Sequence, residues 1–271
     1  MEKQLITLIK KFYGKEPDKI ENITAEKSYR EDSGSFLFEI NNQKIKAIVF
    51  SDKEELHNFL LYVPKLKRVP KILFHKNNMI FVEWLEGQSL QREDLTNEDL
   101  KEIAKLQAEI HKSKIKINRA DILKSSKKSF EKYLYYYQKN SILSKKEIDK
   151  INEMFKDFFS RDIKVSLIHG DFNVDNLLKT KKGWYSIDNE TLMLGITGID
   201  FGKPITNFCN LNEAKIETYL KAYNSVSPID FYTKDKDRYE LFFLLKQMVS
   251  RHKKKQSMEK HLRVLREIIS K

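Results

Sequence analysis

The chain has 271 residues, a formal net charge of +12 and a hydrophobic content of 40%. This length allows two lobes with a sizeable core, and the absence of repeats or low-complexity stretches argues against a fibrous or disordered chain. The single cysteine, Cys209, excludes an intrachain disulfide and is expected to be a small core hydrophobe. Because no segment resembles a signal peptide or reaches membrane-spanning length, we expect a cytoplasmic protein with no membrane partner.

The positive charge comes mainly from lysine and is densest at residues 251–255, Arg-His-Lys-Lys-Lys. A basic chain can bind nucleic acid, an anionic membrane or an anionic substrate, but a biased composition also gives a lysine-rich surface. The cluster has no interleaved aromatic residues that could stack on bases, and the sequence matches no nucleic-acid-binding motif. We therefore expect no nucleic-acid partner.

The first eighty residues have mainly strand signals. Apolar residues at helical spacing predict a short helix over 3–12, and β-favouring runs at 35–40 and 44–50 around an Asn-rich turn predict a hairpin. Ser51 is the expected N-cap of a following helix, with Glu54 completing a capping box. A second strand pair is expected at residues 71–75 and 79–84.

The remainder of the chain has mainly helical periodicity. The helical pattern covers residues 96–160 and returns in three blocks. These blocks are residues 211–223, 239–249 and 258–269. Between the two helical regions, the apolar run 165–168 predicts a strand that pairs with residues 184–187.

This order of elements predicts an α+β, two-lobed protein. The expected divisions are a small antiparallel N-terminal lobe over 1–82, a hinge over 83–87 and a larger helical lobe over 88–271. A cleft between two such lobes is a common place for small ligands.

The polar segment after the strand at 165–168 has the chemistry of phosphoryl transfer. Asp171 and Asn176 have the D-x-x-x-x-N spacing of a kinase catalytic loop. In such a loop the carboxylate orients the acceptor hydroxyl, and the amide oxygen can bind magnesium. Asp188, at the end of another apolar run, adds a carboxylate suited to the same hard cation. The alternative is a polar turn in which Asp171 and Asn176 only cap backbone groups.

At these residues the sequence resembles the aminoglycoside phosphotransferase and choline kinase family, which has a protein-kinase-like fold. The H-G-D-x-x-x-x-N motif spans 169–176, and Ile187-Asp188 resembles the family's later I-D segment. The resemblance implies that Asp171 is the catalytic base and that Asn176 and Asp188 hold Mg2+. It also implies that His169 shapes the loop and that Asp200 anchors it.

The nucleotide-binding residues are also implied by this resemblance. The family's phosphate-binding lysine is expected at Lys46, with Lys44 as the alternative, and Glu55 is its expected partner because Glu54 is assigned to the capping box. The hinge backbone, including Glu83 and Leu85, would hold the adenine. No G-x-G-x-x-G loop is present, so Ser33 and Ser35 are expected to meet the phosphates instead.

The expected function is a Mg2+-dependent transfer of phosphate from ATP or GTP to a hydroxyl of a small molecule. Aminoglycoside-like antibiotics, choline-like amino alcohols and sugars are all open as acceptors, and the protein could be a monomer or a homodimer. A compact atypical protein kinase is a weaker alternative, because only eleven residues separate Asp188 from Asp200 and no A-P-E-like segment follows. An inactive binding module is disfavoured, since Asp171, Asn176 and Asp188 are all present.

Overall fold

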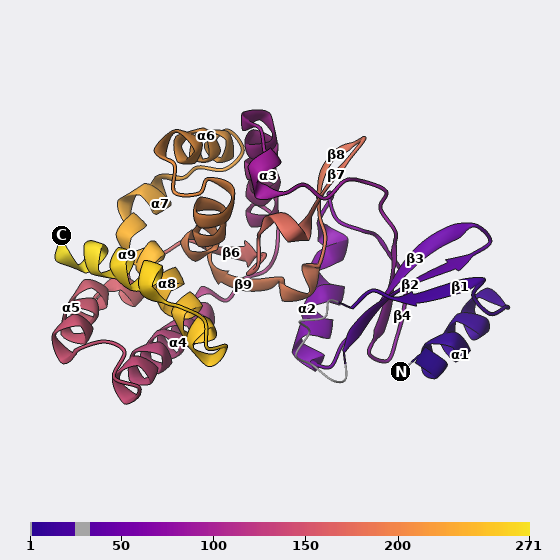
Figure 1. The fold of residues 1–271 in the computed structure, drawn as a ribbon, viewed down its shortest axis with the longest axis horizontal. Coiled ribbons are helices and arrows are strands. Elements are labelled where there is room, and N and C mark those ends of the chain that lie inside the picture. Colours follow the sequence, from indigo (N-terminus) through magenta and orange to yellow (C-terminus); the bar gives the residue numbers. More distant parts are fainter. Residues whose placement is uncertain (1, 25–32) are drawn as a thin grey trace. The chain divides into compact units, whose positions relative to one another are not determined.

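The computed structural model describes residues 2–24 and 33–271, which form two compact units (Figure 1). The first unit consists of residues 1–90 together with 175–192, and the second consists of residues 91–174 together with 193–271. The lobe and hinge boundaries given above remain a prediction.

Over its described residues, the first unit contains a sheet, two α-helices and a separate hairpin. Its helices and strands are α1 (Glu2–Tyr13), β1 (Lys19–Asn22), β2 (Gly34–Ile40), β3 (Gln43–Val49), α2 (Lys53–Tyr62), β4 (Ile72–Lys76), β5 (Met79–Glu83), β7 (Leu177–Thr180) and β8 (Gly183–Ser186). In the described residues the sheet has the antiparallel order β1-β2-β3-β5-β4, which confirms both predicted hairpins. The first hairpin turns at Asn41 and Asn42, whose φ angles of 52° and 60° asparagine tolerates well.

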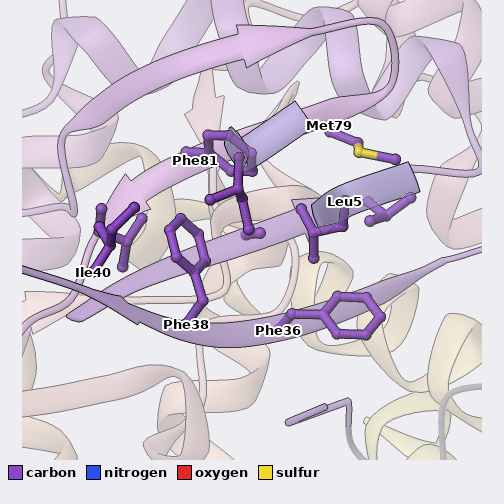
Figure 2. Close-up of a cluster of buried hydrophobic side chains, with 10 residues drawn as sticks. Leu5, Phe36, Phe38, Ile40, Met79 and Phe81 are labelled. Atoms are coloured by element: carbon purple, nitrogen blue, oxygen red, sulfur yellow. The ribbon is translucent and has the colours of Figure 1, made fainter. Parts of the chain in front are cut away.

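The core of this unit lies between α1 and one face of the sheet (Figure 2). Burial alternates along β2, so Phe36 and Phe38 point toward Leu5 and Ile9 of α1. Because strand side chains alternate between faces, Lys46 lies on the opposite face of β3 from the core residue Ile45. Lys46 shares that opposite face with buried apolar residues, since its cross-strand partner is Val82 and the next residue of β3 on this face is Ile48.

The start of α2 corrects the predicted cap. Asp52, rather than Ser51, is the N-cap, and its carboxylate accepts hydrogen bonds from the backbone N–H groups of Glu54 and Glu55 at 2.7 and 3.2 Å. The helix begins one residue later than predicted. An aspartate at this position satisfies free N–H groups and favours the positive end of the helix dipole, so a Ser51–Glu54 capping box is not needed.

The second unit is mostly helical. Its elements are α3 (Asn97–His111), α4 (Arg119–Lys139), α5 (Lys145–Phe155), β6 (Val165–Ile168), β9 (Met193–Ile196), α6 (Glu213–Asn224), α7 (Asp230–Lys234), α8 (Lys236–Lys253) and α9 (Glu259–Ser270). The expected helical blocks are confirmed. None of the helices in the described ranges has both the length and the hydropathy needed to cross a membrane.

The predicted partner of the strand at 165–168 is wrong. β6 pairs with β9, and the run that was expected to pair with it lies in β8, which pairs with β7. The turn between β7 and β8 includes Gly183, whose φ of 109° suits glycine, so these neighbouring segments form a local hairpin. β6 instead pairs with β9, which contains Gly195. The side chain of Ile168 lies so close to this glycine that a Cβ there would be 2.4 Å from Cδ1 of Ile168.

Cys209 is fully buried, as predicted for a core hydrophobe. Burial raises the pKa of its thiol to about 12, although Lys215 acts in the opposite direction. A thiol with so little thiolate at neutral pH is unreactive, so its role is packing.

A close contact at Gly198 gives a stability prediction for the second unit. A Cβ at this position would lie 2.5 Å from the Tyr239 ring, which is itself buried. We expect Gly198→Ala to lower the free energy of unfolding by about 2 kcal/mol, as overpacking does in well-packed cores. Urea unfolding measures this loss. In the double variant with Tyr239→Leu, the loss of unfolding free energy should be smaller than the sum of the losses in the two single variants. Strict additivity would contradict the contact between Gly198 and the Tyr239 ring.

Candidate active site

Two groups of candidate residues are present, one in each unit. In the first unit, the Lys46 ammonium donates to Oδ1 of Asp188 at 2.5 Å. Only 16% of the Lys46 side chain is exposed, compared with 48% for Lys44, which reaches Glu86 at 3.4 Å. The structure thus brings Lys46, and not Lys44, to Asp188.

Glu190 lies beside this ion pair. Burial opposes the charge of Lys46, but Glu190 and Asp188 outweigh that effect and raise the pKa of the lysine. Burial also raises the pKa of the Glu190 carboxyl, against the attraction of Lys46 and with the repulsion of Asp188 and Glu55. Glu55 comes from α2, which packs against the short helix Asn189–Thr191. One lysine therefore meets several carboxylates here, an arrangement that suits the binding of further positive charge.

The β7–β8 hairpin brings Asn176 and Asp188 together. They flank its two ends, and the Ile187 N–H donates to the Asn176 carbonyl oxygen at 2.9 Å. Asp188 has left-handed backbone angles, φ 52° and ψ 52°. The buried Asn189 holds this turn, because its side chain accepts from the Ser186 hydroxyl at 2.8 Å and donates to the Ser186 carbonyl at 3.0 Å.

The oxygen groups at this end of the hairpin fit Mg2+. Mg2+ bound together with a nucleotide needs only one or two protein carboxylates, because phosphate oxygens and water complete its octahedron. Asp188 offers a carboxylate that is 49% exposed, and the side-chain amide of Asn176, whose backbone binds the Ile187 N–H next to Asp188, is a second candidate ligand. Over the residues that the structure describes, no group of three or more His, Cys, Asp or Glu side chains gathers as a metal centre.

The other nucleotide-binding candidates lie at the edges of strands. Glu83 ends β5 and its carboxylate accepts from the Lys71 N–H at 3.0 Å, while Leu85 follows in irregular backbone. Ser33 immediately precedes β2, and Ser35 lies within it, with its N–H donating to the Thr24 hydroxyl at 2.9 Å. The backbone N–H of Ser35 is therefore used by a contact within the protein.

Asp171 belongs to the second unit, where it forms an ion pair with Lys203. The Asp171 side chain is 35% exposed and that of Lys203 is 23% exposed. Asp171 follows Gly170, whose φ of 75° lets the chain turn sharply after β6. The carboxylate is thus partly shielded, accessible to a ligand and balanced by a cation.

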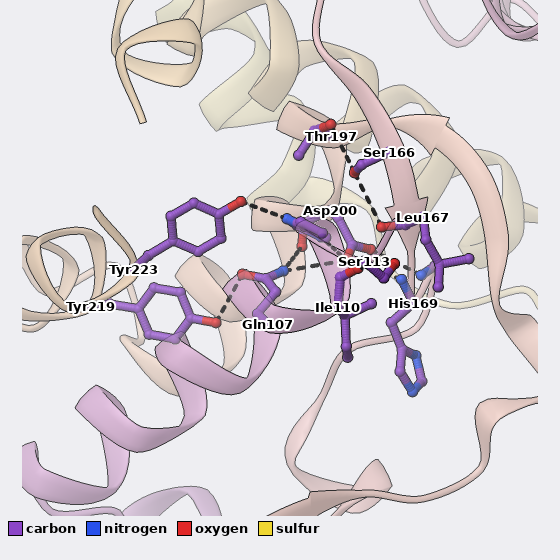
Figure 3. A network of polar contacts seen from close by, with 12 residues as sticks. Gln107, Ile110, Ser113, Ser166, Leu167, His169, Thr197, Asp200, Tyr219 and Tyr223 are labelled. Atoms are coloured by element: carbon purple, nitrogen blue, oxygen red, sulfur yellow. Dashed lines mark hydrogen bonds and ion pairs between the residues drawn. The ribbon is translucent and has the colours of Figure 1, made fainter. Parts of the chain in front are cut away.

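Asp200 binds the backbone just before Asp171 (Figure 3). Its carboxylate accepts from the N–H groups of His169 at 3.2 Å and Gly170 at 2.9 Å. The ring nitrogen Nε2 of His111 lies 3.0 Å from the same carboxylate and donates to it. The buried aspartate therefore fixes the start of the 169–176 segment from outside that segment.

Helices α3 and α6 complete this network. The Gln107 amide donates to the Asp200 carbonyl oxygen at 2.9 Å and accepts from the Tyr219 hydroxyl at 3.0 Å. The Tyr223 hydroxyl lies 2.8 Å from Nδ1 of His111, which accepts from it when Nε2 carries the proton. His111 is thus a hydrogen-bonding core residue, and the tyrosines of α6 hold it in place.

The Asp200 network predicts a pH-dependent stability. Burial alone would raise the pKa of Asp200, but the His111 hydrogen bond, the imidazoles of His111 and His169 and the Gly170 N–H lower it from 3.8 to about 2. Because the pKa is depressed on folding, the stabilisation is complete above the unfolded pKa and is lost as pH falls from about 4 to about 2. Asp200→Asn should therefore lower the free energy of unfolding at pH 7 by about 2 kcal/mol.

Denaturant unfolding of the Asp200 variant at several pH values checks this expectation. The difference from the parent chain should shrink as the pH falls below 4. Asp162→Asn is the control, because that side chain is 101% exposed and its pair with Arg119 is a surface contact of small energy. An equal loss at pH 7 and in acid would show that Asp200 stabilises the fold without its charge.

Some residues of these groups were not predicted from the sequence. No motif pointed to Glu190, and no pattern singled out Lys203 among 51 basic residues. Gln107, Tyr219 and Tyr223 have no motif beyond helical spacing. Only the fold shows that these residues converge on Asp171, Asp188 or Asp200.

Comparison with known proteins identifies the family. The sequence profile of the phosphotransferase enzyme family matches residues 44–242. The Protein LicA homolog of Metamycoplasma hominis is 29% identical over 157 residues, 57% of this chain and 60% of that protein. The match thus spans less than two thirds of that relative's length.

Solved structures of two kinases have the same fold. The ADP-bound aminoglycoside phosphotransferase APH(2'')-Ib has a TM-score of 0.65 and 15% identity, with 99% of this chain and 97% of that chain covered. A choline kinase from Cryptosporidium parvum Iowa II also has a TM-score of 0.65, with 14% identity and coverage of 90% and 87%. These likenesses show the protein-kinase-like fold that the sequence predicted.

The family model and the fold define the same class of protein, the phosphotransferases. The chain belongs to the phosphotransferase enzyme family.

Proposed function

We propose that this protein transfers the γ-phosphoryl group of ATP or GTP, in the presence of Mg2+, to a hydroxyl group of a small molecule. The observation that carries the proposal is the Lys46–Asp188 ion pair beside Asn176. A buried lysine, a carboxylate and an amide oxygen together are the groups that phosphoryl transfer needs for binding phosphates and a divalent cation.

Lys46, Asn176 and Asp188 would bind the nucleotide. In the proposed complex the Lys46 ammonium would contact phosphate oxygens, and Asn176 and Asp188 would hold Mg2+, which would supply charge neutralisation at the phosphates. Glu55 and Glu190 orient the lysine. The backbone of Glu83 and Leu85 would hold the base, and the hydroxyls of Ser33 and Ser35 would meet the phosphates.

Asp171 would act on the acceptor. Its carboxylate accepts the hydroxyl proton as the acceptor oxygen forms a bond to the γ-phosphorus and the bond to the bridging oxygen of the nucleoside diphosphate breaks. The transition state is loose, so the carboxylate contributes mainly by orienting the hydroxyl. Asp200 and His169 support this role by fixing the backbone before Asp171.

The acceptor class is proposed only as a hydroxylated small molecule. The related folds include an aminoglycoside phosphotransferase and a choline kinase, so aminoglycosides, amino alcohols and sugars are all candidates. A nucleotide-consumption assay over these three classes, with ATP and GTP in parallel and Mg2+ present, tests the proposal. We expect acceptor-dependent formation of nucleoside diphosphate with at least one class. No acceptor-dependent turnover, together with no Mg-nucleotide binding by calorimetry, would contradict it.

A further inference from the structure

Lys203 is a partly buried cation in direct contact with the proposed base, Asp171. Its backbone is fixed on both sides. The preceding Gly202 lies so close to Phe243 of α8 that a Cβ there would approach the ring to 2.1 Å, and Pro204 begins the turn Pro204–Phe208. The backbone that carries Lys203 is therefore closely packed against α8.

The surroundings of Lys203 disfavour a positive charge. Burial, with repulsion from Lys246 and Lys254, lowers the pKa of Lys203 to about 8. The carboxylate that faces this ammonium comes from Asp171. A lysine that only increases solubility has no reason to be partly buried. An apolar side chain at this position would avoid the free-energy cost of burying a charge. The position is therefore better explained by what the ammonium does to Asp171.

We propose that Lys203 is a positioning residue for phosphoryl transfer, because its ammonium holds the Asp171 carboxylate ionised and in a fixed orientation. Lys203 holds Oδ1 of this carboxylate. This inference rests on the function proposed above.

The chemistry of the reaction makes this arrangement useful. A cation beside Asp171 lowers the basicity of the carboxylate, which would harm a reaction that depends on early proton removal. Phosphoryl transfer through a loose transition state needs little activation of the nucleophile, so correct placement of the hydroxyl outweighs base strength. Lys203 also keeps Asp171 ionised before the reaction, so that its carboxylate is ready to accept the hydroxyl proton.

The test compares Lys203→Met, which removes the charge, with Lys203→Arg, which keeps it. We expect Lys203→Met to lower kcat about 10- to 100-fold with little change in the KM for nucleotide, and Lys203→Arg to recover most of that loss. Lys164→Met is the control, since Lys164 is also a partly buried lysine of this unit but binds the Ser227 hydroxyl at 3.1 Å. Circular dichroism and thermal melting show whether each variant is folded, and Lys203→Gln replaces the methionine variant if that one is not.

Two pH measurements separate positioning from a merely structural role. The acidic limb of kcat/KM should move to higher pH in Lys203→Met, because the pKa of Asp171 is no longer held down, and the alkaline limb should move upward in Lys203→Arg. The Asp171 carboxyl, titrated by carbon NMR without nucleotide or acceptor, should show a pKa higher by about one unit in Lys203→Met.

The outcomes are distinguishable. A kcat within twofold of the Lys164→Met control, or an Asp171 titration unchanged from the parent chain, would overturn the role of Lys203 while leaving the proposed function standing. If no acceptor supports turnover, the proposed function fails, and the carboxyl titration still decides whether Lys203 controls the charge of Asp171.

Discussion

Asp171→Asn is expected to lower kcat by about 10³-fold, within the range that positioned acid–base groups contribute. Asparagine keeps the size of the side chain but cannot accept the hydroxyl proton, and it no longer pairs with the Lys203 ammonium. Asp200 holds the loop backbone before Asp171, so the fold should persist. Steady-state kinetics, with calorimetry for Mg-nucleotide affinity, measures the two effects separately.

The control for this variant is Asp175→Asn. Asp175 is an exposed aspartate of the same segment and has no assigned role in the chemistry. It should keep turnover within a few fold of the parent chain. Full turnover in Asp171→Asn would remove Asp171 from the role of base, whereas a loss of nucleotide affinity would show that the variant disturbs more than the acceptor.

Asp188→Asn is expected to weaken Mg2+-dependent nucleotide binding about 100-fold or more, because a ligand of the metal loses its charge. Asparagine is the better substitution than alanine, since Asp188 has left-handed backbone angles that asparagine tolerates. In this variant the Lys46 ammonium keeps Glu190 nearby, so the ion-pair surroundings are only partly lost.

Calorimetry with and without Mg2+ checks this prediction. The affinity of the parent chain should depend strongly on Mg2+, and that dependence should disappear in the variant. Glu21→Gln is the control, because it removes an exposed, lysine-paired carboxylate from β1 of the same unit. Unchanged Mg-nucleotide affinity in Asp188→Asn would show that the metal is held elsewhere.

The elements that sequence reasoning placed well are those with strong local signals. The strands β2, β3, β4 and β5 have β-favouring runs bounded by turns, and local pairing settles their partners. The predicted pairing of β6 was wrong because its partner β9 is a short strand with no distinctive pattern. β7, which directly follows the polar motif, was not predicted as a strand. Pairing between distant segments depends on the tertiary fold and not on local propensity.

The candidate site shows the same limit. Asp171, Asn176 and Asp188 could be predicted because their spacing and position after apolar runs are local properties of the sequence. Asp188 and Glu190 lie beside Lys46 because of the way the β7–β8 hairpin packs in the unit that contains β3. No local sequence pattern predicts this packing. Lys203 is harder still to predict, since it is one lysine in a lysine-rich chain and only its contact with Asp171 distinguishes it from the others.

The buried Cys209 makes this chain well suited to site-specific labelling. With a thiol pKa of about 12, only about one molecule in 10⁵ has a Cys209 thiolate at pH 7. Maleimide dyes should therefore not react with this cysteine in the folded protein. Because the sequence has no other cysteine, new thiols at the exposed Lys182 and Lys221 would be the reactive ones. A donor and an acceptor dye at these two positions, one in each unit, would report by energy transfer how nucleotide and acceptor change the separation of the units.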